Sequence, residues 1–433
     1  MLDEYPFAVA MRAFLASPGV EWIVNGTLTI LAPAGSIGIE LSLHNERPCP
    51  LHIPTFDVFL TDGRGGHPTS LVIDASSQFE KEWSGPEGRI AVGSLIDGLH
   101  TVSETNPWIR LTWDPLTTEA VVLIRNRTDR WAWRNYGLVV EAIMDDGQKR
   151  VHFSHYQAVD EACTDYIATP GLSEVEVMRA KVFRELVLLA ADSKSHLNAG
   201  KDRSSNRWRP SEMTQSLVKV LHVMSADAEL AMTDKIFASR ELAFGTHGLL
   251  RHFKFWSFTE KRALAKLGAD VFDFLQCNSF NAYCAFGTAL GMAREGGFIP
   301  HDDDMDIVAF KDDWISDSLN LLPDIASHAE NLSRQLNAAG FRSTAQSTHA
   351  KVYQSFNGTD LNLDIFPAVR NHGTLATALN QFFPHEPRVI SNRLLYGIPL
   401  PFPEDLDEYC LSVYGTNWKI PLRTFKHLKR SNT

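Results

Sequence analysis

A chain of 433 residues with 44% hydrophobic side chains can bury two or three separate cores, so two or three domains are expected. Its 52 acidic and 41 basic residues leave a net charge of -11, which argues against a nucleic-acid partner, because phosphate backbones call for a basic face. The 5 cysteines are scattered and include no CxxC pair. They predict reduced thiols in a cytoplasmic setting rather than a zinc ribbon or a disulfide framework.

The first residues carry acids early and lack a basic-then-apolar secretory pattern, so no signal peptide is predicted. No uninterrupted apolar run reaches the length of a membrane span, and no transmembrane segment is predicted. The C-terminal tail is basic, with Arg423, Lys426, Lys429 and Arg430. A solvated tail is the first interpretation, and peripheral association with the inner face of a membrane is the alternative.

Residues 1–165 have the texture of an all-β domain. Short apolar runs are separated by clusters of Gly, Pro, Asn and Asp, and they lie at 27–31, 37–43, 58–60, 120–124 and 137–143. Many short strands at this spacing predict a β-sandwich of the jelly-roll type.

Four short motifs in this region occur in a familiar order. They are Asp97-Gly98, Asn106-Pro107-Trp108, Asn126-Arg127 and Asp145-Asp146-Gly147. This order resembles discoidin (F5/8 type C) domains of the galactose-binding-like fold, in which a D-G turn, an N-P-W strand and an N-R-x-D loop recur. The resemblance implies loops that bind a glycan, with Trp131 and Trp133 as stacking candidates. Aromatic residues spaced by two more often pack in the core or at its rim, so neither is assigned to the site.

Residues 166–255 are predicted to be a helical connector, and residues 256–433 an α+β domain. Ser173 and Glu176 form a capping-box pattern that begins one helix, and a second helix begins near Ser211. A third helix carries Leu264, Leu267, Val271 and Leu275 at three- and four-residue steps and leads directly into the next motif.

The stretch 286–310 concentrates the chemistry. Four aspartates fall within five positions, Asp302, Asp303, Asp304 and Asp306, and like charges this close either lie in solvent or bind a metal. Asp306 opens an apolar run of strand type, and side chains two apart on a strand share a face, so Asp304 and Asp306 are expected to point the same way. Such a pair suits Mg²⁺. An isolated D-x-D is more often a solvated acidic turn.

The residues before the aspartates favour the functional interpretation. Gly287 and Thr288 precede a predicted helix, and exposed N–H groups beside a hydroxyl suit a phosphate oxygen. Arg294 adds a fixed cationic fork for a second phosphate contact. Gly296 and Gly297 allow the chain to turn back toward the acidic strand.

Asn357-Gly358 lies between two alternating runs and predicts a two-residue hairpin. Counting outward from this turn places Lys351 opposite Asp364. Asp364 interrupts an apolar run, and an acid in a central strand is seldom buried without a partner. Lys351 is therefore expected either to contact phosphate or to form a plain cross-strand ion pair.

The stretch FGTALGMAREGGFIPHDDDMD resembles the signature of the LicD family, G-T-L-L-G-x-x-R-x-G-G-F-I-P-W-D-D-D-I-D, and departs from it at His301. Residues 363–367 and the closing Tyr414-Gly415, Trp418 and Pro421 also match the family pattern. The resemblance implies a nucleotidyltransferase fold over residues 256–433. The implied site has Gly287 and Thr288 on donor phosphate, and Mg²⁺, with Mn²⁺ as the alternative, on Asp304 and Asp306.

The resemblance also implies roles for the remaining acids and for the substrates. Asp364 is the third carboxylate, as metal ligand or as base, while Asp302 supports the metal shell and Asp303 is peripheral. Family members pass a phospho-substituent, such as phosphocholine or ribitol phosphate, from a CDP-linked alcohol to a glycan hydroxyl and release CMP. Arg294 and Lys351 would then hold the donor phosphates. The alternatives are a nucleotidyltransferase that uses an NTP and releases pyrophosphate, and a glycan-binding protein with an inactive transferase domain.

Overall fold

The computed structural model describes residues 6–44, 49–60, 71–77, 89–90, 96–127, 132–191, 211–245, 248–318, 320–371, 374–378 and 389–421. The chain divides into two compact units. The first comprises Met1–Lys201 and Arg207–Phe244, and the second comprises Asp202–Asn206 and Gly245–Thr433. An all-β region in the first unit and an α+β domain in the second make the protein multidomain, as predicted.

The first unit contains two antiparallel sheets. The four-stranded sheet has the order β1 (Thr27–Ala32), β8 (Ala120–Arg125), β3 (His52–Leu60) and β6 (Ile96–His100). The six-stranded sheet has the order β10 (Lys149–Ser154), β9 (Leu138–Met144), β2 (Ser36–Leu43), β7 (Trp108–Trp113), β4 (Leu71–Ala75) and β5 (Arg89–Ile90). Strands β1 and β7 bury every second side chain, as expected when one face of a sheet packs on the core.

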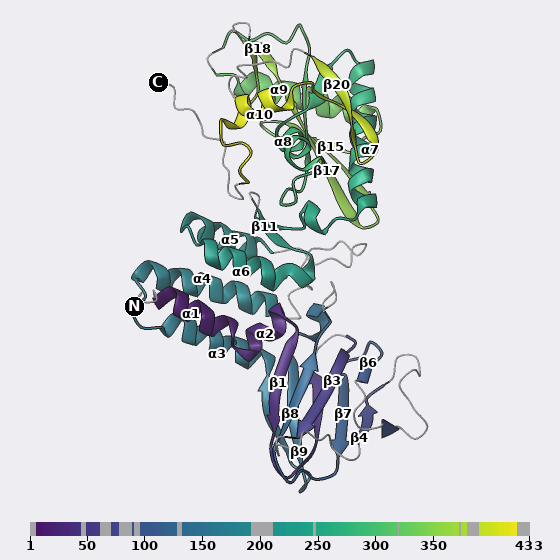
Figure 1. Ribbon diagram of the computed structural model, residues 1–433. Helices are drawn as coiled ribbons and strands as arrows, with labels where there is room; N and C mark the ends of the chain where they lie inside the picture. The colour runs from purple at the N-terminus through teal and green to yellow at the C-terminus, as the bar shows by residue number, and fades with distance from the viewer. Residues whose placement is uncertain are drawn as a thin grey trace. The chain divides into compact units, whose positions relative to one another are not determined.

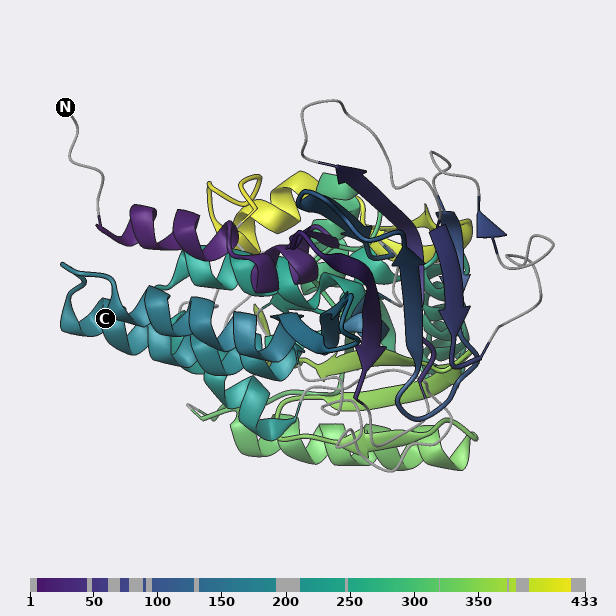
Figure 2. The ribbon, with the colours of Figure 1, turned by 90° about the horizontal axis from the view of Figure 1, so that it is seen from below.

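In the sequence, helices both precede and follow the strands of the first unit. Two precede them, α1 (Pro6–Leu15) and α2 (Pro18–Val24), and four follow, α3 (His155–Ala168), α4 (Glu174–Ala191), α5 (Glu212–Val223) and α6 (Asp227–Phe237). Helix α4 packs against α3, α5 and α6 (Figures 1 and 2). Helices α4 to α6, which fall within the predicted connector at 166–255, belong to the compact unit that contains the sheets. Sequence analysis also missed α1, α2 and α3.

Two helix starts in this unit follow the predicted capping chemistry. Glu176 accepts hydrogen bonds from the Ser173 N–H and hydroxyl, and the Ser211 hydroxyl accepts from Thr214 N–H. Among the described residues, no single helix has the length and apolarity to cross a membrane. The pair α1 and α2 meets the two criteria jointly, but its members are bent by 73°.

The discoidin resemblance is only partly reflected in local structure. Trp108 begins strand β7, as the N-P-W motif implied, but Asp97 and Gly98 lie inside strand β6 and form no turn. Trp131 lies outside the described residues. The guanidinium of Arg240 covers the ring of Trp133 at 5.3 Å from the ring centroid, which identifies Trp133 as a packing residue.

The second unit is built on a five-stranded sheet. Its order is β13 (Asn281–Cys284), β14 (Met305–Phe310), β17 (Thr359–Pro367), β16 (Ala350–Phe356) and β15 (Ser343–Ala345). The pair β14 and β17 is parallel and the other pairs are antiparallel. Around the sheet lie α7 (Phe258–Cys277), α8 (Phe286–Glu295), α9 (Leu322–Ala338), α10 (Leu406–Tyr414) and the hairpin of β20 (Ile390–Leu395) and β21 (Ile398–Pro403). Strand β13 separates α7 from the Gly-Thr step and was not predicted.

Helix α7 covers one face of this sheet. At Gly268 of α7, an added Cβ would lie 2.7 Å from the Met305 side chain and 3.8 Å from that of Leu363. Because side chains alternate along a strand, the opposite face of β14 and β17 presents Asp306 and Asp364. Helix α8 lies on that side, where the Phe286 ring contacts Phe366 at a centroid distance of 5.0 Å.

The predicted hairpin is confirmed. Strands β16 and β17 turn at Asn357-Gly358, where Asn357 has a φ of 50°. Phe356 pairs with Thr359, and Lys351 faces Asp364 as the count from the turn predicted. This register is what brings a cation to the acidic face of the sheet.

Candidate active site

Asp306 and Asp364 are register partners on the parallel strands β14 and β17. Partners in adjacent strands project from the same face of a sheet, so the two carboxylates are neighbours. Asp304 directly precedes β14, and all three residues are buried, with 7–9% of their surface exposed. Carboxylates buried side by side are costly without a cation, which distinguishes this group from a solvated acidic turn.

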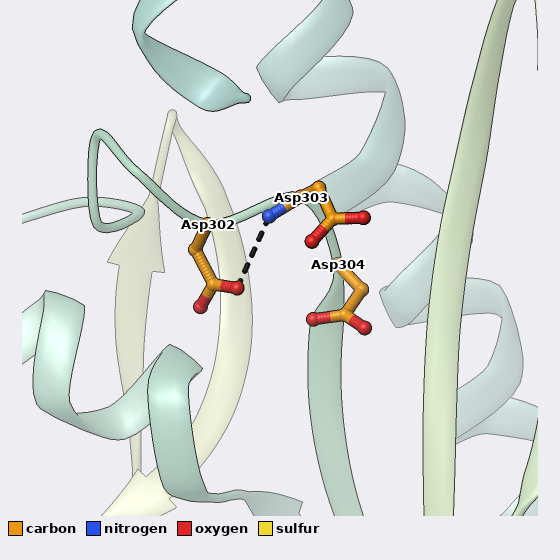
Figure 3. A group of neighbouring side chains, drawn as sticks. All are labelled: Asp302, Asp303 and Asp304. Atoms are coloured by element: carbon orange, nitrogen blue, oxygen red, sulfur yellow. Dashed lines mark hydrogen bonds between the residues drawn. The ribbon is translucent and has the colours of Figure 1, made fainter. Parts of the chain in front are cut away.

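The acidic run itself also forms a compact group. Asp302, Asp303 and Asp304 each offer a carboxylate oxygen, and these oxygens lie within 4.8 Å of one another. Figure 3 shows the three side chains as neighbours, with the Asp303 N–H donating to Asp302 Oδ1 at 3.1 Å. Asp303, expected to be peripheral, is thus as close to the group as Asp302.

Burial and mutual repulsion dominate the electrostatics of the group. Burial raises the pKa of Asp304 well above its usual value, and the charges of Asp303, Asp302, Asp306 and Asp364 raise it further. Carboxylate oxygens are the ligands that Mg²⁺ and Mn²⁺ take in proteins. The Asp364 Oδ1 atom is buried, and the Lys351 ammonium lies 3.2 Å from it. A hard divalent cation therefore fits these residues.

The start of helix α8 holds Asp306 in place. The Gly287 N–H donates to Asp306 Oδ2 at 2.8 Å, and the Asp306 N–H donates to the Thr288 hydroxyl at 2.8 Å. Phe286 before them has a φ of 41°, uncommon for a non-glycine residue, and its N–H donates to the Tyr409 hydroxyl at 3.1 Å. Gly287 and Thr288 therefore form hydrogen bonds with Asp306 in this structure. Their contact with donor phosphate stays a prediction.

Asp364 lies between two basic side chains. Lys351 Nζ is 3.2 Å from Oδ1, and His349 Nε2 is 3.2 Å from Oδ2. Burial lowers the pKa of Lys351, but the charges of Asp364 and Asp304 outweigh burial and raise it, so the ammonium stays charged. Sequence analysis predicted Lys351 and missed His349. The available signal was its position two residues before Lys351, which the alternation of a strand places on the same side.

Arg294 occupies the last turn of α8, seven residues after Gly287 and so about 10 Å further along the helix. Its side chain is 11% exposed, and it lies 3.9 Å from Glu295. Burial raises the pKa of Tyr414 of α10 well above its usual value, and the charges of Asp306 and Asp302 raise it further. The charge of Arg294 opposes this shift in part. Arg294 and Tyr414 thus act on the acidic face at a longer range, whereas Lys351 pairs directly with Asp364.

An α+β domain that gathers buried aspartates from two adjacent parallel strands is the kind of site that metal-dependent phosphate transfer uses. Residues 280–397, within the second unit, match the family model of the LicD/FKTN/FKRP nucleotidyltransferase domain. This range runs from the start of β13 to the β20–β21 turn and contains the aspartates, His349 and Lys351. Proteins of the LicD family are generally transferases, and the match suggests a phosphotransferase-like or nucleotidyltransferase-like activity.

A solved structure, described as an antigenic nucleotidyltransferase-like protein from Paracoccidioides brasiliensis, is similar to this chain at 15% identity and a TM-score of 0.21. The similarity covers 32% of this chain and 59% of the solved chain, which is less than two thirds of that protein. No curated protein matches the sequence.

Proposed function

We propose that the protein is a Mg²⁺-dependent transferase that moves a phospho-substituent from a CDP-linked alcohol to a glycan hydroxyl and releases CMP. Phosphocholine and ribitol phosphate are the expected kinds of substituent, and cell-surface polysaccharide synthesis or decoration is the expected setting. The observation that carries the proposal is the pairing of Asp306 with Asp364 beside Asp304 within a LicD domain.

The proposed ligands of the ion are Asp304, Asp306, Asp302 and Asp364. When bound, Mg²⁺ would neutralise the diphosphate of the donor as the CMP leaves. Gly287 and Thr288 keep Asp306 turned toward the neighbouring strand through the two hydrogen bonds described above. The ammonium of Lys351 remains charged beside Asp364. It would therefore be able to contact an oxygen of a donor phosphate that the ion holds near the same carboxylates.

Under this proposal, no side chain of the protein needs to form a covalent bond with the substrate. Positioning and charge stabilisation supply most of the rate in phosphoryl transfer, so the site needs fixed carboxylates and fixed cations. Asp304 and Asp364 are 7% exposed, and Asp306 is 9% exposed, so packing limits their movement. The β-sheets of the first unit are proposed to present the glycan acceptor, and the reaction is expected in the cytoplasm or at the inner face of a membrane.

The test is release of CMP from CDP-choline, CDP-ribitol, CDP-glycerol and CDP-ethanolamine in the presence of Mg²⁺. We expect release from one of these donors, and loss of that release in Asp304→Ala and Asp306→Ala. Asp312→Ala is the matched control, because it removes the same charge from a side chain that is 81% exposed. Pyrophosphate release from an NTP would identify a nucleotidyltransferase instead. Glycan binding without either product would identify an inactive transferase domain.

A further inference from the structure

We propose that His349 is a positioning residue that fixes the carboxylate of Asp364 as a ligand of the divalent cation. The inference rests on the proposed metal site and adds a residue to it. His349 directly precedes strand β16, and its Nε2 atom lies 3.2 Å from Asp364 Oδ2. Because a carboxylate only accepts hydrogen bonds, Nε2 carries the hydrogen in this pair.

Contacts on the other side of the ring hold His349 in this orientation. Its Nδ1 atom is 2.9 Å from the Thr348 hydroxyl, so a hydrogen bond holds the ring at the nitrogen that faces away from Asp364. The ring also packs against Phe366, two residues after Asp364 on the same strand, at a centroid distance of 5.1 Å. The His349 side chain is only 18% exposed, so the imidazole has little room to turn away.

Lys351 completes the enclosure of Asp364. Its Nζ atom lies 3.2 Å from Oδ1, so each oxygen of the carboxylate faces a different basic residue. Rotation of the carboxylate about its Cβ–Cγ bond would break both contacts together. Each oxygen still has a second lone pair, so a carboxylate held in this way can also coordinate a metal.

A ligand of this kind gains affinity from its supporting hydrogen bonds. Ligating carboxylates are themselves hydrogen-bonded in metal sites, and removal of such a partner typically lowers metal affinity or activity about 10- to 100-fold. Without His349, the partner left to Asp364 among the described residues would be Lys351, a cation that competes with the metal for the same carboxylate. The histidine therefore supplies a second contact that orients Asp364.

The experiment is a Mn²⁺ titration of the full chain, with free Mn²⁺ measured by electron paramagnetic resonance. We expect His349→Leu to raise the dissociation constant about 10-fold or more. His349→Gln should remain within about threefold of the wild type, because its amide can still donate to Asp364. His328→Leu is the matched control: it makes the same change at a ring that stacks on Trp314, with 3.9 Å between ring centroids.

Thr348→Val provides a second variant that leaves the imidazole in place. It removes the hydroxyl next to Nδ1 and should raise the dissociation constant by a few fold, less than His349→Leu does. Thermal unfolding of each variant identifies any change that arises from loss of the fold.

An unchanged dissociation constant in His349→Leu would overturn the inference, and so would a His349→Gln variant as weak as His349→Leu. A wild-type chain that binds no Mn²⁺ would overturn it as well. The titration needs no donor, so the two proposals can fail separately. If the variants change Mn²⁺ affinity as expected but no donor releases CMP, the proposed CDP-linked donor is wrong and the role of His349 stands.

Discussion

The Cα atom of Gly287 and the carboxylate of Asp302 lie so close that a Cβ on Gly287 would be 2.5 Å from Asp302 Oδ2. The same Cβ would be 3.0 Å from Asp306 Oδ2. Any side chain at this position in the first turn of α8 would therefore have to displace the end of Asp302. The missing side chain leaves the space in which two carboxylates converge.

Gly287→Ala should therefore weaken metal binding more than it weakens the fold. The methyl group must displace the end of Asp302 and disturb Asp306, while alanine favours a helix by about 0.5–1 kcal/mol over glycine. We expect the midpoint of thermal unfolding without metal to stay within a few degrees of the wild type, and the Mn²⁺ dissociation constant to rise about 10-fold. Equal Mn²⁺ affinities in the two proteins would contradict this explanation of the glycine.

Asp304→Asn should stabilise the second unit in the absence of metal. Burial and four neighbouring acids raise the folded-state pKa of Asp304 above its unfolded value, so the folded protein resists ionisation that the unfolded chain accepts. The resulting loss of stability is absent below the unfolded pKa, near 4, and grows as pH rises above it. At neutral pH we expect a gain of about 1 kcal/mol, or about 2–4 °C in Tm.

The same variant should lose the stabilisation that Mg²⁺ gives the wild type, because it removes a ligand charge. Calorimetry with and without Mg²⁺ measures both effects, and Asp312→Asn provides the control for a general change in net charge. A metal-free Asp304→Asn protein that unfolds at a lower temperature than the wild type would mean that the carboxylate is already compensated in the fold.

The parts of the site that sequence analysis predicted are those that local geometry determines. Asn357-Gly358 fixes the hairpin register, and strand alternation then fixes the side on which Lys351 and Asp364 lie. Contacts between segments distant in sequence were not predictable in this way. The Tyr409 hydroxyl accepts the Phe286 N–H from 123 positions further along the chain. The space at Gly287 depends on the chain after α8, which brings the Asp302 carboxylate back to the first turn of that helix.

The fold shows the same division. Short strands and capped helices were recognisable because turn residues, periodicity and caps act within a few positions. Helix α2 has no such cap, because the Ser17 hydroxyl before it donates to the Phe14 carbonyl oxygen at 2.7 Å instead of accepting from the first turn. In α1, Phe14 is buried against Tyr166 and Phe183. Tertiary packing, rather than local sequence, keeps these segments helical.

Tyr396→Phe should loosen the segment that leads into the aspartates. The Tyr396 hydroxyl accepts the Phe298 N–H at 3.0 Å, and Phe298 lies four residues before Asp302. Leaving a partly buried N–H without its acceptor costs about 1 kcal/mol, and the cost rises to about 3 kcal/mol if water cannot reach it. We expect that loss in the unfolding free energy of the second unit, together with faster amide exchange at Phe298.

Tyr353→Phe is the control for this change, since the Tyr353 hydroxyl makes no hydrogen bond to any residue in the described part of the chain. It should leave both measurements as they are in the wild type. Equal protection of the Phe298 amide in Tyr396→Phe and in the wild type would show that the hydroxyl is not the group that holds this segment.

His155 should make the first unit sensitive to acid. Its ring is fully buried, where Nδ1 accepts the Gly137 N–H at 2.9 Å and Nε2 lies 3.1 Å from the Gly19 carbonyl oxygen, which it serves as a donor. Burial lowers the pKa of His155 to about 3, far below that of an exposed histidine. Between that value and about 6.5 the unfolded chain takes up a proton that the folded unit excludes. Stability is therefore complete above pH 6.5 and falls by up to about 1.4 kcal/mol per pH unit as pH drops toward 3.

Denaturant unfolding of the full chain at a series of pH values, followed by a signal from the first unit, measures this slope. His155→Gln keeps a donor and an acceptor but cannot ionise, so it should lower stability at pH 7 and reduce the slope between pH 6 and pH 4. His44→Gln is the control, because that side chain is exposed just after strand β2. If the slope in His155→Gln equals that of the wild type, the acid sensitivity of the unit arises from other groups.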